Sequence, residues 1–341
     1  MRSMRGWELG VGMCAILLVA GGCAQRNTTL TGFTRSPYFD EQVRTYTFEP
    51  EVTVHINAPP ATAFDARKPT LLVIYALPNG NTIAQTIGCQ KAPDLDWHFY
   101  IQHIGAQTRL LRARRTDVNL VVAYLEAGGR SWPTWRKKHA DSSARIVALV
   151  DELRALFPDE RTTVALTAHS GGGSFLNGYL NAVTQLPDWL ERIVWLDANY
   201  GYSDDERHAE KLLEWLQRGP RHYAGVVAYD DREIEVDGKK VVGPNGGTYR
   251  RTVEMIARCG QLTRLECAEL ADRKRCHALD GRLDIQLFKN PNNKILHTVL
   301  VERNGFIHAL TFGTSPAAVA NELFTEPIYS AWIQGGNTLP G

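Results

Sequence analysis

The sequence has no excess of charge of either sign. Its 38 Lys and Arg residues nearly balance 37 Asp and Glu residues, for a formal net charge of +1. Proteins that bind nucleic acid need a basic surface, so we expect no nucleic-acid partner. Cysteine is also scarce, with six in 341 residues, and the C-x2-C pair typical of zinc sites is missing. We therefore expect no metal site.

The first apolar run, residues 11–20, is too short to span a bilayer comfortably. Arg2 and Arg5 precede this run, and the small residues Gly21 and Gly22 follow it. A basic start, a short apolar stretch and a small-residue end are typical of an export signal that is cleaved off.

Residues 19–23, Val-Ala-Gly-Gly-Cys, resemble the lipobox of bacterial lipoproteins, although Ala20 stands where Leu is more usual. The resemblance implies that Cys23 is diacylated and becomes the new N-terminus. Ala24 in the next position implies the outer membrane in a host that has one. The alternative is an ordinary cleaved signal with an incidental cysteine.

Residues 24–36 are polar and aperiodic, as expected of a tether. We therefore predict a signal peptide over residues 1–22, a lipidated tether over 23–36 and an α/β domain over 37–341. The domain is expected to be exported and anchored to the cell envelope.

Strand-like and helix-like segments alternate through most of the domain, which predicts a mostly parallel, doubly wound sheet with helices on both faces. The expected strands are residues 44–48, 52–56, 70–75, 118–124, 162–166, 192–196, 223–228 and 295–301, and the expected helices are residues 96–115, 142–156, 173–183, 205–216 and 248–259.

Residues 232–295 form a long insert before the expected last strand, and Asp237-Gly238 in its first part predicts a hairpin. We interpret the insert as a cap, with a surface elaboration as the alternative. Four cysteines remain after the signal, and they could form two disulfides whose pairing the sequence leaves open. They are Cys89, Cys259, Cys267 and Cys276.

The turn Ala168-His169-Ser170-Gly171-Gly172 follows an expected strand and precedes an expected helix. It resembles the nucleophile elbow, G-x-S-x-G, of the α/β-hydrolases, with Ala168 in place of the first glycine. The resemblance implies that Ser170 is the nucleophile. Small residues are needed on either side because strand and helix approach closely there. The alternative is a glycine-rich turn without chemistry.

A nucleophilic serine needs a base, and the family places a histidine after the final strand. His308 lies just beyond the expected strand 295–301 and is the predicted base, with a surface histidine as the alternative. His297 falls within that strand, so we interpret it as a packed or surface residue.

The acid of the triad has two candidates, since in this fold it can follow either of two strands. Asp197 ends an apolar strand, where a buried carboxylate would need a partner such as an imidazolium. Asp230 ends the next strand, the commoner family position, but it could simply be solvated. Asp197 is slightly favoured.

An oxyanion hole would combine the backbone N–H of Gly171 with one donor from the loop 76–81. Pro78 has no N–H, so four residues stay open as the second donor: Leu77, Asn79, Gly80 and Asn81.

Two aromatic pairs lie past the ends of expected strands, Trp132 with Trp135 and Tyr200 with Tyr202. They could line a substrate cleft or pack in the core.

Together these residues predict a serine hydrolase that cleaves a small-molecule or polymer-derived ester through an acyl-enzyme on Ser170, without a cofactor. An amidase or peptidase with the same triad is one alternative, and a lipid-anchored binding protein on a hydrolase fold is another.

Overall fold

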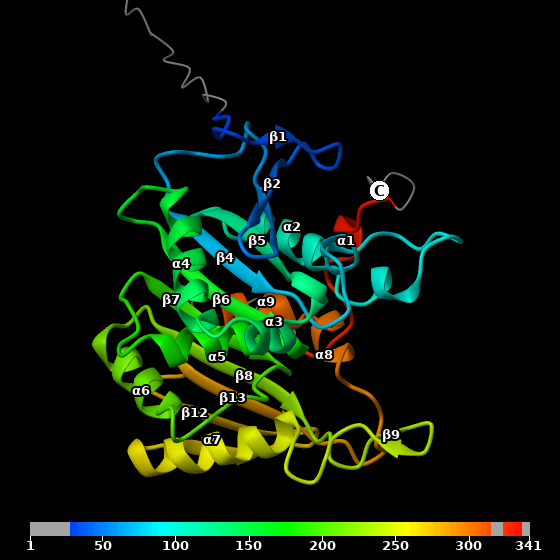
Figure 1. The fold of residues 1–341 in the computed structure, drawn as a ribbon, viewed down its shortest axis with the longest axis vertical. Helices are drawn as coiled ribbons and strands as arrows, with labels where there is room; N and C mark the ends of the chain where they lie inside the picture. The colour runs from blue at the N-terminus through cyan, green and yellow to red at the C-terminus, as the bar shows by residue number, and fades with distance from the viewer. Residues whose placement is uncertain (1–27, 315–322, 336–341) are drawn as a thin grey trace, which may run out of the picture.

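The computed structural model describes residues 28–314 and 323–335 (Figure 1). The predicted signal peptide, residues 1–22, and the lipidation site Cys23 lie outside the described residues. Within the described ranges, no helix combines the length and the apolar character needed to cross a membrane.

One large sheet runs through the described part of the chain, in the order β1-β2-β3-β5-β4-β6-β7-β8-β13-β12-β11. Its strands are β1 Thr34–Arg35, β2 Gln42–Phe48, β3 Val52–Ala58, β4 Thr70–Ala76, β5 Asn119–Ala127, β6 Thr163–His169, β7 Leu190–Leu196, β8 Tyr223–Tyr229, β11 Glu266–Glu269, β12 Arg273–Ala278 and β13 Leu283–Phe288. The central strands β5, β4, β6, β7, β8 and β13 are parallel, and the strands at both edges are antiparallel. A short hairpin, β9 Glu235–Val236 with β10 Lys239–Lys240, lies outside this sheet.

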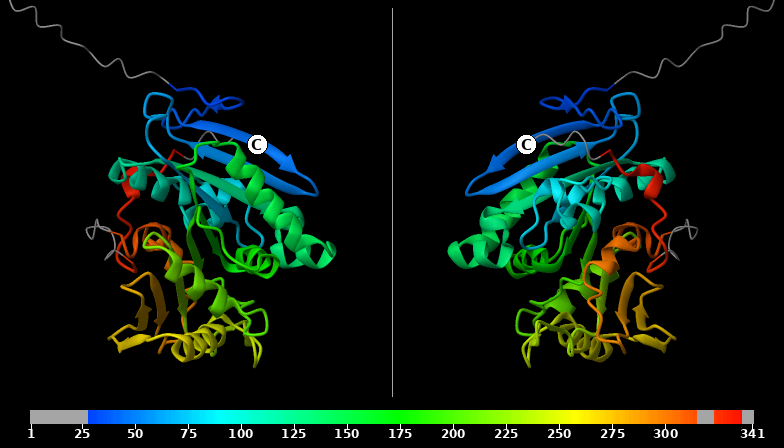
Figure 2. Two further views of the ribbon diagram at one scale, coloured as in Figure 1. Left: turned by 90° about the vertical axis from the view of Figure 1, so that its left-hand side faces the viewer. Right: turned by 90° about the vertical axis from the view of Figure 1, so that its right-hand side faces the viewer.

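Helices cover both faces of the sheet (Figure 2). One face carries α3 Trp132–Lys138, α4 Ser142–Ala155, α5 Gly173–Ala182, α6 His208–Arg218 and α7 Thr248–Leu262. The other carries α1 Ile83–Ile87, α2 Ile104–Arg114, α8 Val299–Glu302 and α9 Gly305–Thr311. The predicted α/β architecture, a mostly parallel sheet between two helical layers, is confirmed.

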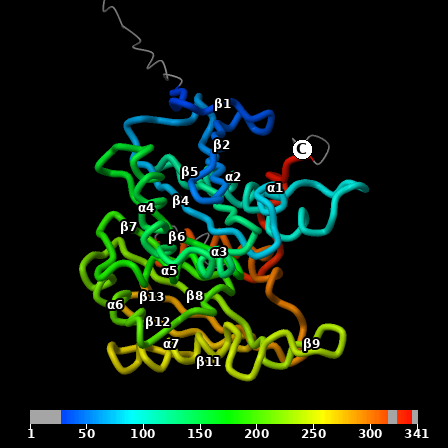
Figure 3. Tube along the Cα trace, viewed as in Figure 1, coloured from blue at the N-terminus to red at the C-terminus, as the bar shows by residue number. Residues whose placement is uncertain are grey.

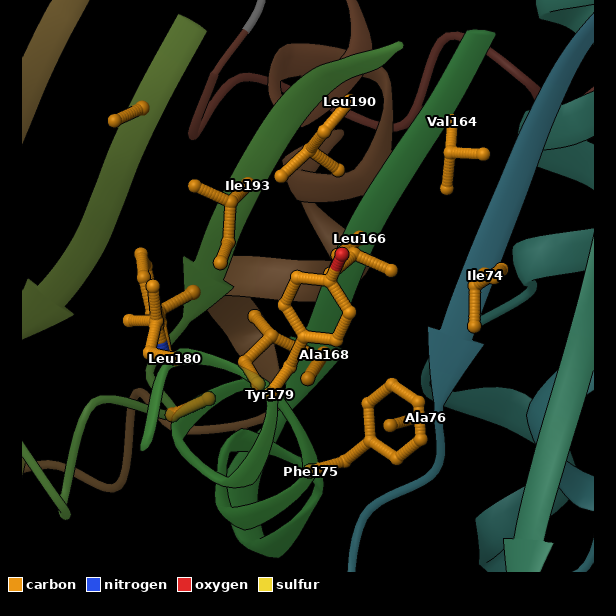
Figure 4. Packing of buried hydrophobic residues seen from close by; sticks show 14 of the residues in the cluster. Ile74, Ala76, Val164, Leu166, Ala168, Phe175, Tyr179, Leu180, Leu190 and Ile193 are labelled. Carbon is orange, nitrogen blue, oxygen red and sulfur yellow. The ribbon is translucent and has the colours of Figure 1, made fainter. Parts of the chain in front are cut away.

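Alternating side chains of β6 fix the strand to the helix that follows it. Val164, Leu166 and Ala168 are fully buried and point to the same face of the sheet (Figure 4). Phe175 and Tyr179 of α5 pack against this row. Burying a side chain of this size contributes about 1.5–3 kcal/mol, so β6 and α5 form a rigid frame for the turn between them.

The prediction that residues 232–295 form a cap is wrong, although its hairpin and helix are confirmed. The segment completes the central sheet instead, because β13 pairs in parallel with β8 and all six of its residues are buried. Asp284 and Gln286 alternate with apolar residues in β13, and this pattern does not look like a buried parallel strand.

The predicted last strand, residues 295–301, is also wrong. Its first part is a loop in which Ile295 is exposed, and its second part begins the short helix α8. Leu300 and Val301 are buried on the face covered by α2 and α9. A short apolar run cannot by itself distinguish a strand from a buried helical turn.

The structure contains one of the two disulfides that four cysteines could form. Cys267 of β11 is bonded to Cys276 of β12. Cys89 and Cys259 are free and buried, so they pack as small apolar side chains.

The domain begins before Pro37, since part of the predicted tether packs on it. Residues 34–35 form β1 and pair with β2. The backbone N–H of Leu30 donates to Gln42 Oε1 at 2.8 Å. The described part of the predicted tether therefore belongs to the folded domain, where it forms one edge of the sheet.

Glu41 connects this N-terminal edge to the helical layer. Its carboxylate is 2% exposed and accepts hydrogen bonds from Arg109 and Arg112 of α2 at 2.8–3.0 Å. Burial alone would raise the pKa of Glu41, but the two guanidinium groups lower it below its ordinary value. The carboxylate is thus an ionised group inside the protein.

We expect Glu41→Gln to lower the free energy of unfolding by about 3–5 kcal/mol, because removing one partner leaves buried cations uncompensated. Urea unfolding followed by circular dichroism measures this loss. The neighbouring substitution Asp40→Asn is the control: Asp40 pairs with Arg35 at the surface, so its loss should cost less than about 1 kcal/mol. Equal effects of the two substitutions would contradict the buried network.

Candidate active site

Ser170 lies between the end of β6 and the start of α5, and its backbone is left-handed with φ +55°. A non-glycine residue in this region is strained, by about 1–3 kcal/mol, and such strain is typical of functional turns. The side chain is half-buried rather than enclosed. The strand, sharp turn and helix are those expected of a nucleophile elbow.

The glycines after Ser170 are required by the close approach of the turn to neighbouring strands. A Cβ at Gly172 would collide with the carbonyl oxygen of Ala76 at the end of β4. A Cβ at Gly173 would collide with the carbonyl oxygen of Ala198 after β7. The turn is therefore wedged between the ends of β4 and β7, which places the residues that follow those strands beside Ser170.

The histidine that meets Asp197 is His297. Its Nδ1 is hydrogen bonded to Asp197 Oδ2, and the carboxylate is fully buried. The backbone of Asp197 is also left-handed, with φ +47°, and its N–H donates to the carbonyl of Val227 at 2.6 Å. This bond fixes the Asp197 backbone at the end of β7, so its carboxylate faces the His297 ring.

His169, the residue before Ser170, is hydrogen bonded to the backbone of His297 and so keeps His297 close to the elbow. The two rings lie 4.4 Å apart, and His169 Nε2 is 3.0 Å from the carbonyl oxygen of His297. Burial, followed by the nearby His297, keeps the pKa of His169 well below its ordinary value. His169 is therefore neutral, and its Nε2–H donates to that carbonyl.

The predicted base, His308, is not at this site. It is buried in α9, where its Nε2 lies 3.3 Å from both Asp284 Oδ2 and Gln286 Nε2. The rule that a histidine follows the last strand still holds here, but the last strand is β13. His297 is the first histidine after β13, so a correct assignment of that strand would have identified it.

Of the two acid candidates, Asp230 is occupied elsewhere. It forms a bidentate pair with Arg232 at 2.7–2.8 Å and is partly exposed. The hydrogen bond to Arg232 lowers the pKa of Asp230. Asp197 is thus the candidate that the structure brings to a histidine.

The structure reduces the number of residues that could supply the second oxyanion donor. The N–H of Leu77 donates to Leu125 at 3.1 Å, and the N–H of Gly80 donates to Arg130 at 2.9 Å. Both groups are therefore committed to other carbonyls. The Asn79 side chain lies where a Cβ of Gly171 would project, so Asn79 is beside the first donor.

Of the four aromatic residues expected near a cleft, Tyr200 alone is exposed. Trp132 is 1% exposed and packs edge to face with Phe175 at 4.8 Å, so its prediction as a cleft residue is wrong. Tyr202 is buried and donates to Asp204. Tyr200 lies near Asp197 and remains a candidate to contact a substrate.

A cavity of about 810 Å³ opens between α7 and the strands β11 to β13. Its apolar wall includes Tyr249, Val253 and Phe288, and Lys274 and Lys289 also line it. Among the residues that the structure describes, no group of three or more His, Cys, Asp or Glu side chains could hold a metal ion.

No protein-family model matches the chain, and no curated protein matches it. Solved structures with a similar fold include an esterase from an Arctic intertidal metagenomic library, with 11% identity and a TM-score of 0.38 over 76% of this chain and 87% of that one. A poly(aspartic acid) hydrolase from Sphingomonas sp. KT-1 has 13% identity and a TM-score of 0.41 over 75% and 95%. A siderophore hydrolase from Aspergillus nidulans has 11% and 0.38 over 78% and 92%.

The chain's own topology identifies the fold as the α/β-hydrolase type. A left-handed serine follows a central parallel strand, and an aspartate and a histidine follow later strands of the same sheet. Ser170, Asp197 and His297 occur in the chain order of that fold's triads.

The buried pair of Asp284 and His308 stabilises the fold, and we expect this stabilisation to decrease at acidic pH. Burial alone would raise the pKa of Asp284, but His308 and Arg275 lower it to about 2. A depressed pKa stabilises the fold above the unfolded value near 4, and this stabilisation is lost as the pH falls through the folded value.

We therefore expect the stability difference between the native chain and Asp284→Asn to shrink by about 1 kcal/mol between pH 6 and pH 3. Urea unfolding at several pH values measures it. The comparison of two chains at each pH cancels the titration of other carboxylates. A difference that stayed constant with pH would show that Asp284 has an ordinary pKa.

Proposed function

We propose that the chain is a serine hydrolase that cleaves an ester through an acyl-enzyme on Ser170. The observation that supports this most is that three features lie together at the carboxyl ends of the central strands: the strained backbone of Ser170, the His297–Asp197 pair and the close approach of Asn79 to Gly171. A binding protein on the same fold would not need a strained serine beside an ordered imidazole and carboxylate.

His297 is the proposed base. Its Nδ1–H is held by Asp197, which leaves Nε2 to take the proton of the Ser170 hydroxyl. The serine Oγ then forms a bond to the ester carbonyl carbon, and the carbonyl oxygen becomes an oxyanion. We propose that the backbone N–H of Gly171 stabilises that charge together with Asn79, whose side chain lies beside Gly171.

The intermediate collapses when the bond between the carbonyl carbon and the alcohol oxygen breaks. His297 returns its proton to the leaving alkoxide, which departs as the alcohol. Water, deprotonated by the same Nε2, attacks the acyl carbon, and Ser170 leaves with the proton as the carboxylic acid forms. The cycle consumes one water and requires no cofactor.

We expect a fluorophosphonate probe to label the protein once, at Ser170, and Ser170→Ala to abolish both labelling and hydrolysis of p-nitrophenyl esters.

His297→Gln should lower kcat by on the order of 10³-fold or more, whereas the matched variant His308→Gln should keep near-native kcat in its folded fraction. Asp197→Asn should lower kcat by on the order of 10⁴, and Asp230→Asn by less than about threefold. Rates on esters of different acyl length, on amides and on peptidoglycan-type substrates give the substrate class.

Labelling at a different serine would overturn the assignment of Ser170. Equal losses for the two histidine variants would show that His297 is not the base. Cleavage of amides in preference to esters would make the chain an amidase with the same triad.

We also propose that the mature chain is exported and held at the cell envelope by a lipid on Cys23, which the lipobox-like segment supports. Cys23→Ser should shift the protein from the membrane fraction to the soluble fraction, since a cleaved chain without acyl groups loses its anchor. Immunoblots of fractionated cells measure this shift, with Cys14→Ser as the matched control. Retention of Cys23→Ser in membranes would refute lipid anchoring.

A further inference from the structure

Asp197 has a second partner besides His297. The hydroxyl of Thr248 donates to Asp197 Oδ1, while Oδ2 faces the imidazole. Thr248 and Asp197 are both fully buried. Each oxygen of the carboxylate is thus bonded to a donor from a different segment, which restricts rotation of the carboxylate about its bond to Cβ.

Thr248 is the first residue of α7, and a second carboxylate holds it in place. Asp231 Oδ2 accepts the backbone N–H of Thr248 at 2.8 Å and so caps the helix. A Cβ at Gly247 would collide with the Asp231 carboxylate, so glycine is needed for this close fit. The start of α7 is therefore fixed to the loop that follows β8.

The first turn of α7 is also docked on the loop that follows β7. Thr252 donates to the carbonyl of Thr248 at 2.7 Å and accepts from Asn199 Nδ2 at 2.9 Å. Thr252 and Asn199 are buried. These bonds hold the first turn of α7 on the loop after β7, and they do not reach the Asp197 carboxylate.

We propose that Thr248 is a positioning residue of the active site, which acts by orienting the Asp197 carboxylate toward His297. This inference rests on the proposed function and adds a role for α7. A buried carboxylate that loses one of two donors can turn away from the imidazole or recruit water, and either change weakens the orientation of the base.

The test compares variants of Thr248 with an equivalent residue one turn along the helix. Thr248→Val keeps the shape and removes the hydroxyl, and we expect it to lower kcat by on the order of 10- to 100-fold with KM nearly unchanged, the usual effect of losing a hydrogen bond to a charged group. Thr248→Ala should show a similar loss, while Thr248→Ser should restore kcat to within about threefold. Thr252→Val is equally buried and does not touch Asp197, so it should leave kcat near native.

The rate constant for fluorophosphonate labelling is a second readout, which depends on the base but not on a substrate. It should fall in Thr248→Val in parallel with kcat. Circular dichroism and thermal unfolding show whether each variant is folded. Thr248→Ser and Thr252→Val both alter buried packing at the start of α7. If Thr248 had a purely structural role, its variants would lower the yield of folded protein without producing this pattern of rates.

Native kcat and labelling in Thr248→Val would overturn this inference and leave the proposed function intact. Equal losses in Thr248→Val and Thr252→Val would also overturn it, because the effect would then come from packing. Full activity of Ser170→Ala would instead refute the proposed function, so the two failures are distinguishable.

Discussion

Ser170 adopts a left-handed backbone between a buried strand and a helix, and the rest of the site follows from the space that this turn requires. The glycines after it allow the carbonyls of Ala76 and Ala198 to approach the turn closely. These contacts set the ends of β4 and β7 against the elbow, so the loop with Asn79 and the loop with Asp197 lie on its two sides. The packing of β6 against α5 resists relaxation of the strained turn (Figure 4).

Two buried carboxylates with different roles lie at the ends of β7 and β8. Asp197 contacts the imidazole, whereas Asp231 caps the helix whose first hydroxyl meets Asp197. Burial, with the charge of Asp197, raises the pKa of Asp231. The segment after β8 thus contacts the candidate site through the helical layer on one face of the sheet. It does not form a lid over the site.

Much of the fold could be predicted from periodicity, because most of the central strands are largely apolar and short turns separate them from amphipathic helices. The elbow and Asp197 could be predicted for the same reason, since both directly follow such strands. The role of His297 could not be predicted. Asp284 and Gln286 make β13 look unlike a buried strand in the sequence, and the apolar run before Glu302 resembles a strand although it is not one. Trp132 shows the same limit: a position after a strand does not reveal whether a side chain turns toward solvent or toward the core.

The two edges of the sheet lie at opposite ends of the molecule, at β1 and β11 (Figure 3). All four residues of β11 are exposed, and its unpaired backbone groups could template pairing with another chain. Glu266 and Glu269 of this edge form surface ion pairs with basic side chains, and the Cys267–Cys276 bond keeps β11 in register on β12. A reducing solution would break that link and leave β11 held on the longer β12 by backbone pairing of its four residues alone. The bond thereby links the integrity of this edge to the redox state of the surroundings.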